Sequence, residues 1–142
     1  MTKMTKTTAS NDPEGWPLPS GEWVARYLYR SIQLFRELDE VMPAQAMQVF
    51  LTVAAEPDIT MARLAQLCGI SQSSVSRNVS ALGKFHRKGR PGLDLVYAYE
   101  DPMERRRKLV RLTTRGEQLM RALRDVNHDH VVSFRKRGEE ET

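Results

Sequence analysis

The sequence predicts a mainly α-helical domain that carries a small two-stranded β-hairpin. Apolar residues recur every three or four positions over most of the chain, which is typical of amphipathic helices. Two short segments near residue 100 alternate instead, as strands do. The chain has 142 residues, so we expect one domain over residues 21–142, preceded by a flexible arm over residues 1–20.

Composition excludes several classes of protein. The chain is 40 % hydrophobic and 28 % charged, as ordinary soluble proteins are. It contains no apolar run that could cross a bilayer or act as a signal peptide, so we expect a cytoplasmic protein without a membrane partner. The single cysteine, Cys68, excludes an internal disulfide framework, and the three histidines do not have zinc-site spacing. We therefore expect neither metal nor cofactor.

Two helices are predicted on either side of Pro43. An apolar stripe runs through residues 21–42 in steps of four and three. Proline suits the first turn of a helix, so we expect the second helix to begin there and to end before Glu56 and Pro57. The stripe of the first helix consists of Val24, Leu28, Ser31, Phe35, Leu38 and Met42.

A pair of short helices follows, separated by a tight turn. Thr60 is placed to cap a helix over Met61–Cys68, and Gly69 allows the left-handed turn that ends it. Ser71 then starts a second helix that we expect to run to Lys84. Its apolar face contains Val75, Val79 and Leu82, and its polar side contains Ser73, Ser76, Arg77, Ser80 and Lys84.

Two strands and an arginine-rich connection are predicted next. The strands are expected over Leu93–Tyr99 and Lys108–Leu112. Between them, a proline and several acidic residues favour a turn, and we expect three consecutive arginines at this tip to project into solvent. These are Arg105, Arg106 and Arg107.

The last predicted element is a long helix over residues 114–137. Thr114 and Glu117 have the spacing of a capping box, which marks the beginning of a helix. An apolar stripe continues from there. It consists of Leu119, Leu123, Val126, His130 and Phe134.

This order of elements is that of a winged helix-turn-helix, with a DNA-binding core over residues 43–113 and a wing over residues 93–113. The second helix of such a unit enters the major groove, where Gln can pair with adenine, Arg with guanine, and Ser with donors or acceptors. Ser71 also has an explanation as a helix cap. The predicted DNA-binding residues are Ser71, Gln72, Ser73, Ser76, Arg77, Ser80, Lys84, Arg105, Arg106 and Arg107.

The distribution of charge supports a polyanionic partner. Residues 60–115 contain twelve Lys and Arg against four Asp and Glu, a net charge of +8, whereas the chain as a whole has +4. The two flanking segments are therefore mildly acidic. A basic middle of this kind predicts a surface for double-stranded DNA.

The sequence resembles the MarR family of transcription regulators over about residues 59–119. The resemblance lies in Leu-Ala-Gln-Leu-Cys-Gly-Ile-Ser-Gln-Ser-Ser-Val-Ser-Arg and, more specifically, in Asp-Pro-Met-Glu-Arg-Arg-Arg-Lys-Leu-Val-Arg-Leu-Thr-Thr-Arg-Gly. It implies a homodimer held by the helices over residues 21–42 and 114–137, with Ser71–Arg77 opening the recognition helix. It also implies that Arg105 and Arg106 reach the minor groove or its phosphates.

Two features depart from the family pattern. Asn78 stands where the family usually has an apolar residue, and the link over Gly83–Asp94 is unusually long and basic. This link either extends the phosphate-contacting surface or reshapes the base of the wing.

Several other residues have both a functional and a structural interpretation. Cys68 could sense redox state, but its place on the packed side of a helix favours a small buried side chain. His128 and His130 point to different helix faces and cannot share a metal. Aromatic residues at helical spacing are more often core than the lining of an effector pocket. Those considered are Trp23, Tyr27 and Phe35.

The leading functional hypothesis is a dimeric, sequence-specific DNA-binding transcription regulator, more readily a repressor than an activator, with a small-molecule effector as an open option. The alternative is a winged-helix interaction or architectural module that binds DNA without strong sequence preference. We do not expect an enzyme, because the sequence contains no recognisable catalytic set. Asp101 and Glu104 are better explained by turn formation and by the adjacent arginines.

Overall fold

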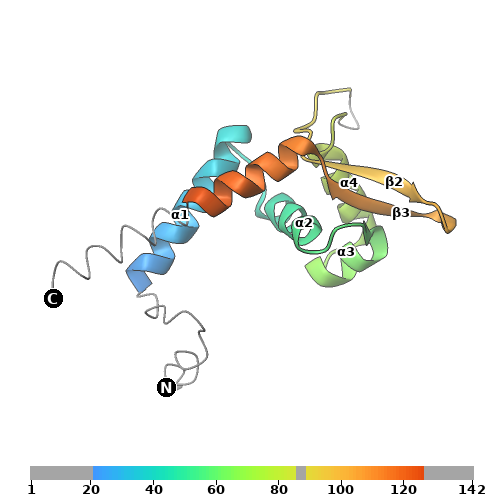
Figure 1. Ribbon diagram of the computed structural model, residues 1–142, viewed down its shortest axis with the longest axis horizontal. Helices are drawn as coiled ribbons and strands as arrows, with labels where there is room; N and C mark the ends of the chain where they lie inside the picture. Colours follow the sequence, from blue (N-terminus) through green and yellow to red (C-terminus); the bar gives the residue numbers. More distant parts are fainter. Residues whose placement is uncertain (1–20, 86–88, 127–142) are drawn as a thin grey trace, which may run out of the picture.

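The computed structural model describes residues 21–85 and 89–126 (Figure 1). The predicted arm, residues 1–20, lies outside the described residues. So do residues 86–88 of the basic link and residues 127–142, which include His128, His130 and Phe134. In the described part, helices pack near the base of a small antiparallel sheet, and the hairpin formed by two of its strands projects away from them.

The first two helices are α1, Gly21–Leu38, and α2, Ala44–Ala55. α1 ends earlier than Met42 because Asp39 forms a local turn, in which its carboxylate accepts the N–H of Val41 at 3.1 Å. The prediction that α2 begins at Pro43 is wrong by one position. Pro43 is the N-cap, with extended backbone, and its carbonyl oxygen accepts the first helical hydrogen bonds.

The predicted helix-turn-helix is confirmed. Strand β1, Ile59–Thr60, leads into α3, Met61–Cys68, which begins with the Thr60 side chain accepting the N–H of Arg63. Gly69 ends α3 in the left-handed conformation, with φ 65°. α4, Gln72–Leu82, begins with Ser71 as its cap.

α4 ends before Lys84 because another segment takes its last carbonyl groups. The N–H groups of Leu93 and Leu95 donate to the carbonyl oxygens of Ala81 and Leu82. Residues 92–95 therefore run back along the end of the helix instead of pairing in the sheet. The predicted strand start at Leu93 is wrong for this reason, and β2 spans Val96–Asp101.

The wing is the hairpin of β2 and β3, Glu104–Leu112. β3 is central in a three-stranded antiparallel sheet with the order β1-β3-β2, and Ile59 pairs with Val110. Strand β1 was not predicted from the sequence. The prediction that the three arginines lie at the tip is wrong, because the turn lies between Asp101 and Glu104 and the arginines belong to β3.

The C-terminal helix, described over residues 114–126, begins one residue earlier than the predicted capping box implies. Thr113, not Thr114, is the cap, since its hydroxyl oxygen accepts the N–H of Gly116 at 3.0 Å. The same hydroxyl donates to the carbonyl oxygen of Asp94 at 2.6 Å, which joins the helix to the segment before β2.

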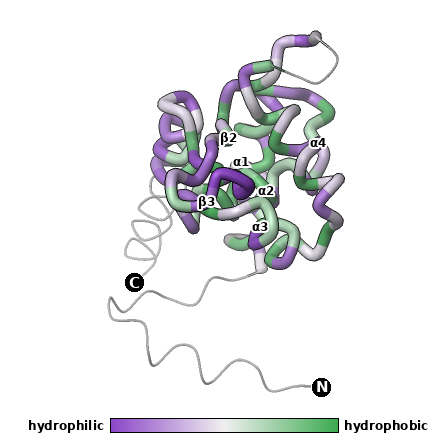
Figure 2. The backbone as a smooth tube through the Cα atoms, turned by 90° about the vertical axis from the view of Figure 1, so that its right-hand side faces the viewer, coloured by the Kyte–Doolittle hydropathy of each residue, from purple (hydrophilic) through white to green (hydrophobic). Residues whose placement is uncertain are grey.

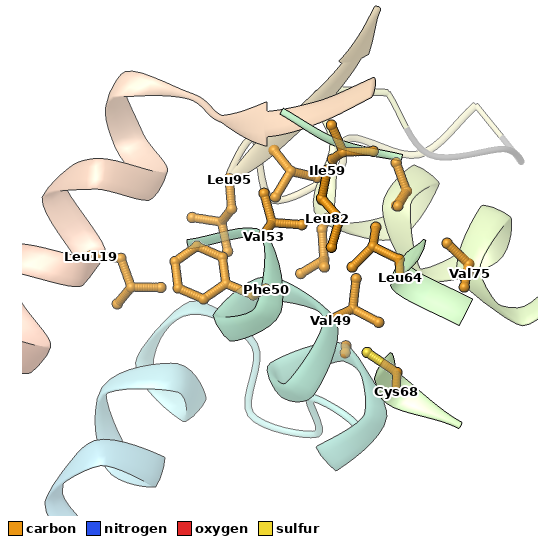
Figure 3. Packing of buried hydrophobic residues seen from close by; sticks show 14 of the residues in the cluster. Val49, Phe50, Val53, Ile59, Leu64, Cys68, Val75, Leu82, Leu95 and Leu119 are labelled. Atoms are coloured by element: carbon orange, nitrogen blue, oxygen red, sulfur yellow. The ribbon is translucent and has the colours of Figure 1, made fainter. Parts of the chain in front are cut away.

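α2 lies at the centre of the hydrophobic core (Figure 3). Phe50 is fully buried and meets Phe35 of α1 edge to face, with ring centroids 5.8 Å apart. Leu82 of α4 and Leu119 of the C-terminal helix belong to the same cluster. One core thus joins the helix-turn-helix, the sheet and the long helices, and the predicted winged helix-turn-helix class is confirmed.

Candidate nucleic-acid interface

The centre of the outward face of α4 consists of Ser73, Arg77 and Ser80, opposite the buried Val75 and Val79. Ser73 and Arg77 are exposed, and Ser80 is half-buried. Side chains on this face have room to meet a partner because the opposite face anchors the helix in the core.

The first turn of α4 is ordered by its own serines. The hydroxyl oxygen of Ser71 accepts the N–H of Ser74 at 3.1 Å, so its interpretation as a cap is confirmed. Arg77 donates to the hydroxyl oxygen of Ser74 at 3.1 Å. This hydrogen bond orients a guanidinium on the outward face without neutralising its charge.

Asn78 links α4 to α2 at the edge of this face. Its amide nitrogen donates to the side-chain oxygen of Gln45 and to the carbonyl oxygen of Ser74, each at 2.9 Å. A polar residue therefore fits where the family pattern has an apolar one. The sequence analysis did not single out Gln45, because a contact across 33 positions leaves no local signal.

On the opposite edge of the same face, Gln72 and Ser76 line a hollow of about 380 Å³, the wing hollow. Its other walls come from the beginning of α3 and from β3. The complete lining is Thr60, Met61, Ala62, Gln72, Ser76, Arg106, Arg107 and Lys108.

The wing is strongly basic along the first half of β3, and Figure 2 shows a strongly hydrophilic stretch of the tube beside the β3 label. Asp101 is buried at the tip, with 7 % of its surface exposed, and its carboxylate accepts the N–H of Met103 at 2.9 Å. Arg107 donates to the same carboxylate at 2.7 and 3.0 Å. Arg107 therefore stabilises the tip and remains only partly available to a partner.

These bonds change the acidity of Asp101. The N–H of Met103 and, second, the guanidinium of Arg107 lower the pKa of Asp101 below its ordinary value. The carboxylate thus stays charged at neutral pH and keeps the turn closed. Arg105 and Arg106 are exposed, and within the described chain neither takes part in an ion pair.

Lys84 lies just beyond the end of α4. Its ammonium group is 5.9 Å from the centre of the Phe85 ring, and its carbonyl oxygen accepts the N–H of Gly92. The Lys84 side chain is exposed, so its charge remains available to a partner. The structure thus places Lys84 in the link to the wing, not on α4.

A second cluster, at the base of the wing, was missed by the sequence analysis. Asp58 has a left-handed backbone, with φ 63°, and accepts hydrogen bonds from Tyr99 and Arg111. The hydrogen bond from Tyr99 first, and that from Arg111 second, lower the pKa of Asp58, and the pKa of the Tyr99 hydroxyl is raised by the same contact. This cluster fixes the turn before β1 against β2 and β3.

Beside this cluster is a second hollow, of about 640 Å³, between the end of α2 and the C-terminal helix. Arg111, Arg121 and Arg124 line it together with Asp58 and Glu117. Its charges therefore largely offset one another, unlike those of the wing hollow.

Among the residues that had both a functional and a structural interpretation, the structure decides Phe35 and Cys68. Phe35 is a core residue, as the aromatic spacing favoured. Tyr27 is half-buried, and the side chain of Trp23 lies outside the described set. Cys68 is buried, with its sulfur 3.5 Å from the Thr52 hydroxyl, so the interpretation as a small buried side chain is confirmed.

Metal-binding clusters and membrane-spanning helices are both absent from the described residues. No group of three or more His, Cys, Asp or Glu side chains there could hold a metal ion. Over residues 21–85 and 89–126, no helix has the length and apolarity needed to span a bilayer.

Comparison with known proteins gives matches among solved structures only. No protein-family profile matches the chain, and no curated protein matches it. The S. aureus MepR–DNA complex shares 17 % identity at a TM-score of 0.63, over 84 % of this chain and 91 % of that one. Regulator Tm0710 from Thermotoga maritima shares 18 % at 0.62, over 80 % and 72 %.

A crystal structure of MarR is similar as well, with 20 % identity and a TM-score of 0.53 over 82 % of this chain and 80 % of that one. The resemblance to the MarR family is thus confirmed at the level of the fold. At such identities the shared architecture is established, and what the chain does must be argued from its own surface.

Proposed function

We propose that this chain is a sequence-specific, DNA-binding transcription regulator of the MarR type. One observation carries the proposal: a recognition helix with an exposed Ser73–Arg77 face and an arginine-rich wing project from one rigid core. A helix of this width fits the major groove, and a basic hairpin beside it can follow the backbone or the minor groove.

Dimerisation is the second part of the proposal. Val24, Leu28 and Ile32 lie four positions apart on α1, and 38–51 % of the surface of each is exposed. A continuous exposed apolar stripe on a long helix favours a partner helix. In Figure 1, α1 and the C-terminal helix extend away from the wing, which leaves the DNA-binding face free in a dimer.

The proposal also covers the operator, the mode of regulation, the cellular location and an effector. A symmetric dimer is suited to a pseudo-palindromic operator, and occupation of a promoter represses without further machinery. Such a regulator would act in the cytoplasm and would not be an enzyme. A small-molecule effector would find room in the hollow of about 640 Å³ beside the C-terminal helix.

Selection from a random DNA pool with the purified full chain tests the proposal. We expect enrichment of an inverted repeat, because two identical protomers would read two half-sites. Affinity for the enriched duplex should fall by about 10³–10⁵ between roughly 50 and 200 mM salt if six to ten phosphates are contacted. Binding without enrichment would instead support the architectural module, and a flat salt titration would contradict both.

Replacement of Arg77 by Ala refines this test. If Arg77 reads a base, we expect the variant to lose about 1–3 kcal/mol of discrimination at one position of each half-site. Arg106→Ala is the matched comparison, because a wing residue that contacts phosphate weakens all sequences to a similar extent.

A further inference from the structure

The wing hollow lies between the recognition helix and the wing, the two parts of the molecule proposed to contact DNA. We propose that it binds one phosphate group of the DNA backbone, so that α4 and β3 hold the same strand between them. The inference rests on the proposed function and assigns a specific role to residues that the sequence analysis treated as base-reading or as general basic surface.

The charge of the hollow favours an anion. Arg106 and Lys108 lie two positions apart in β3 and therefore on the same face of the strand. Both are exposed, whereas the third basic residue, Arg107, is paired with Asp101. Among the described residues that line the hollow, none is acidic. Glu100 of β2 lies opposite Lys108 in the register of the hairpin, but in the described part of the chain neither Arg106 nor Lys108 forms an ion pair.

The facing wall offers neutral hydrogen-bond donors. Gln72 and Ser76 lie four positions apart on α4 and so on the same side of the helix. Neither side chain has a hydrogen-bond partner within the described part of the chain. An amide and a hydroxyl without internal partners, opposite two cations, match a phosphate oxygen that accepts several hydrogen bonds.

The geometry of α4 separates this wall from the base-reading face. Successive residues of a helix are about 100° apart, so Gln72 and Ser76 are displaced toward the wing from Ser73 and Arg77. We therefore assign base contacts to Ser73 and Arg77, and a backbone contact to Gln72 and Ser76. The expectation that Gln72 and Ser76 touch base edges is replaced by this assignment.

The first experiment compares two duplexes of equal length, one enriched by selection and one unrelated. Lys108→Gln is expected to weaken binding of both by the same factor, about tenfold, and to reduce the salt slope by about one phosphate per protomer. Ser76→Ala should also affect both duplexes equally. Ser73→Ala should weaken only the enriched duplex.

The second experiment identifies the phosphate. Neutral methylphosphonate linkages are placed one at a time along the duplex, and we expect the wild type to lose affinity at one linkage in each half-site beside the recognition helix. The Lys108→Gln variant should lose no further affinity at that linkage, because it already lacks the contact between the lysine ammonium and the phosphate. Lys108→Arg should restore the sensitivity. Arg105 is a neighbouring wing cation outside the hollow, so the Arg105→Gln variant should keep the wild-type sensitivity to the neutral linkage.

The outcomes separate this inference from the proposed function. Specific binding in which Lys108→Gln remains as sensitive as the wild type to every linkage would overturn the inference alone. A phosphate contact found on unrelated duplexes without any enriched sequence would overturn sequence specificity alone. Failure to bind any duplex would overturn both.

Discussion

Gly116 lies where two backbone segments approach so closely that a side chain would not fit. A Cβ atom at this position would lie 2.1 Å from the carbonyl oxygen of Leu95, where the C-terminal helix passes the segment before β2. The neighbour is backbone and cannot rotate away. The glycine that ends the family-like segment Leu-Val-Arg-Leu-Thr-Thr-Arg-Gly thus has a packing reason in this chain.

Replacement of Gly116 by Ala tests this contact. We expect the free energy of unfolding to fall by about 3 kcal/mol or more, because the helix must shift away from β2. Gly21→Ala is the control, since nothing lies within 4 Å of a Cβ there. Equal stability of the two variants in urea titrations would show that the helix and the β2 segment do not approach as closely as described.

Asp101 gives a prediction for pH. Its pKa is lowered in the folded state, so its contribution to stability is present above the ordinary value of 3.8 and is lost as pH falls through the lower folded value. In Arg107→Gln we expect the pKa of Asp101, measured by carboxyl-carbon NMR, to rise only part of the way, since the bond from the Met103 N–H remains. An unchanged pKa would exclude the ion pair in solution.

At the scale of elements, short polar caps decide where the helices begin. Thr60, Ser71 and Thr113 each accept a backbone N–H three positions ahead. These caps satisfy N–H groups that have no acceptor within their own helix. Caps of this type are local and readable from sequence, and the sequence analysis identified two of them correctly.

The third cap provides a prediction with an internal control. We expect Thr113→Ala to cost about 1–2 kcal/mol, because the substitution removes both the cap and the bond to the Asp94 carbonyl. Thr114→Ala, at the exposed first position of the helix, should change stability by less than about 0.5 kcal/mol. If thermal unfolding showed a larger loss of stability for Thr114→Ala than for Thr113→Ala, Thr114 would be the cap, as the sequence predicted.

Strand boundaries were predicted less well than helix boundaries. The start of β2 depends on residues 92–95 bonding to the end of α4, and β1 exists only because Ile59 and Thr60 pair with β3. Two residues give no periodic signal by themselves. Pairing with distant backbone therefore determined these elements, and no local pattern could reveal it.

At the scale of the whole molecule, the main feature to explain is the stripe of apolar residues on α1 that is exposed to water, Val24, Leu28 and Ile32. They lie at the end opposite the wing, in a helix whose other side contributes Phe35 to the core. A second copy of the chain would remove them from water and would also place two recognition helices on one DNA duplex.

Introduction of a negative charge on this stripe tests the dimer. In sedimentation at micromolar concentration we expect the wild type to be a dimer, and Leu28→Glu and Ile32→Glu to be monomers, because each would bury a carboxylate between apolar helices. Their affinity for an inverted repeat should fall by about a hundredfold or more, since the two half-sites are no longer linked. Val41→Glu, exposed but off the stripe, should remain dimeric. A dimeric Leu28→Glu would remove α1 from the interface.

The sequence by itself determined the order of helices, the turn at Gly69, the apolar face of α4 and the basic character of the wing, because all of these depend on neighbours within a few positions. Only the tertiary structure decided which basic side chains remain available, since Asp101 engages Arg107 while Arg106 and Lys108 face Gln72 and Ser76 across a hollow. Likewise, only folding brings Asp58 to Tyr99 and Arg111, and Asn78 to Gln45. Such pairs join positions far apart in the chain, and the closure of the shared core places them together.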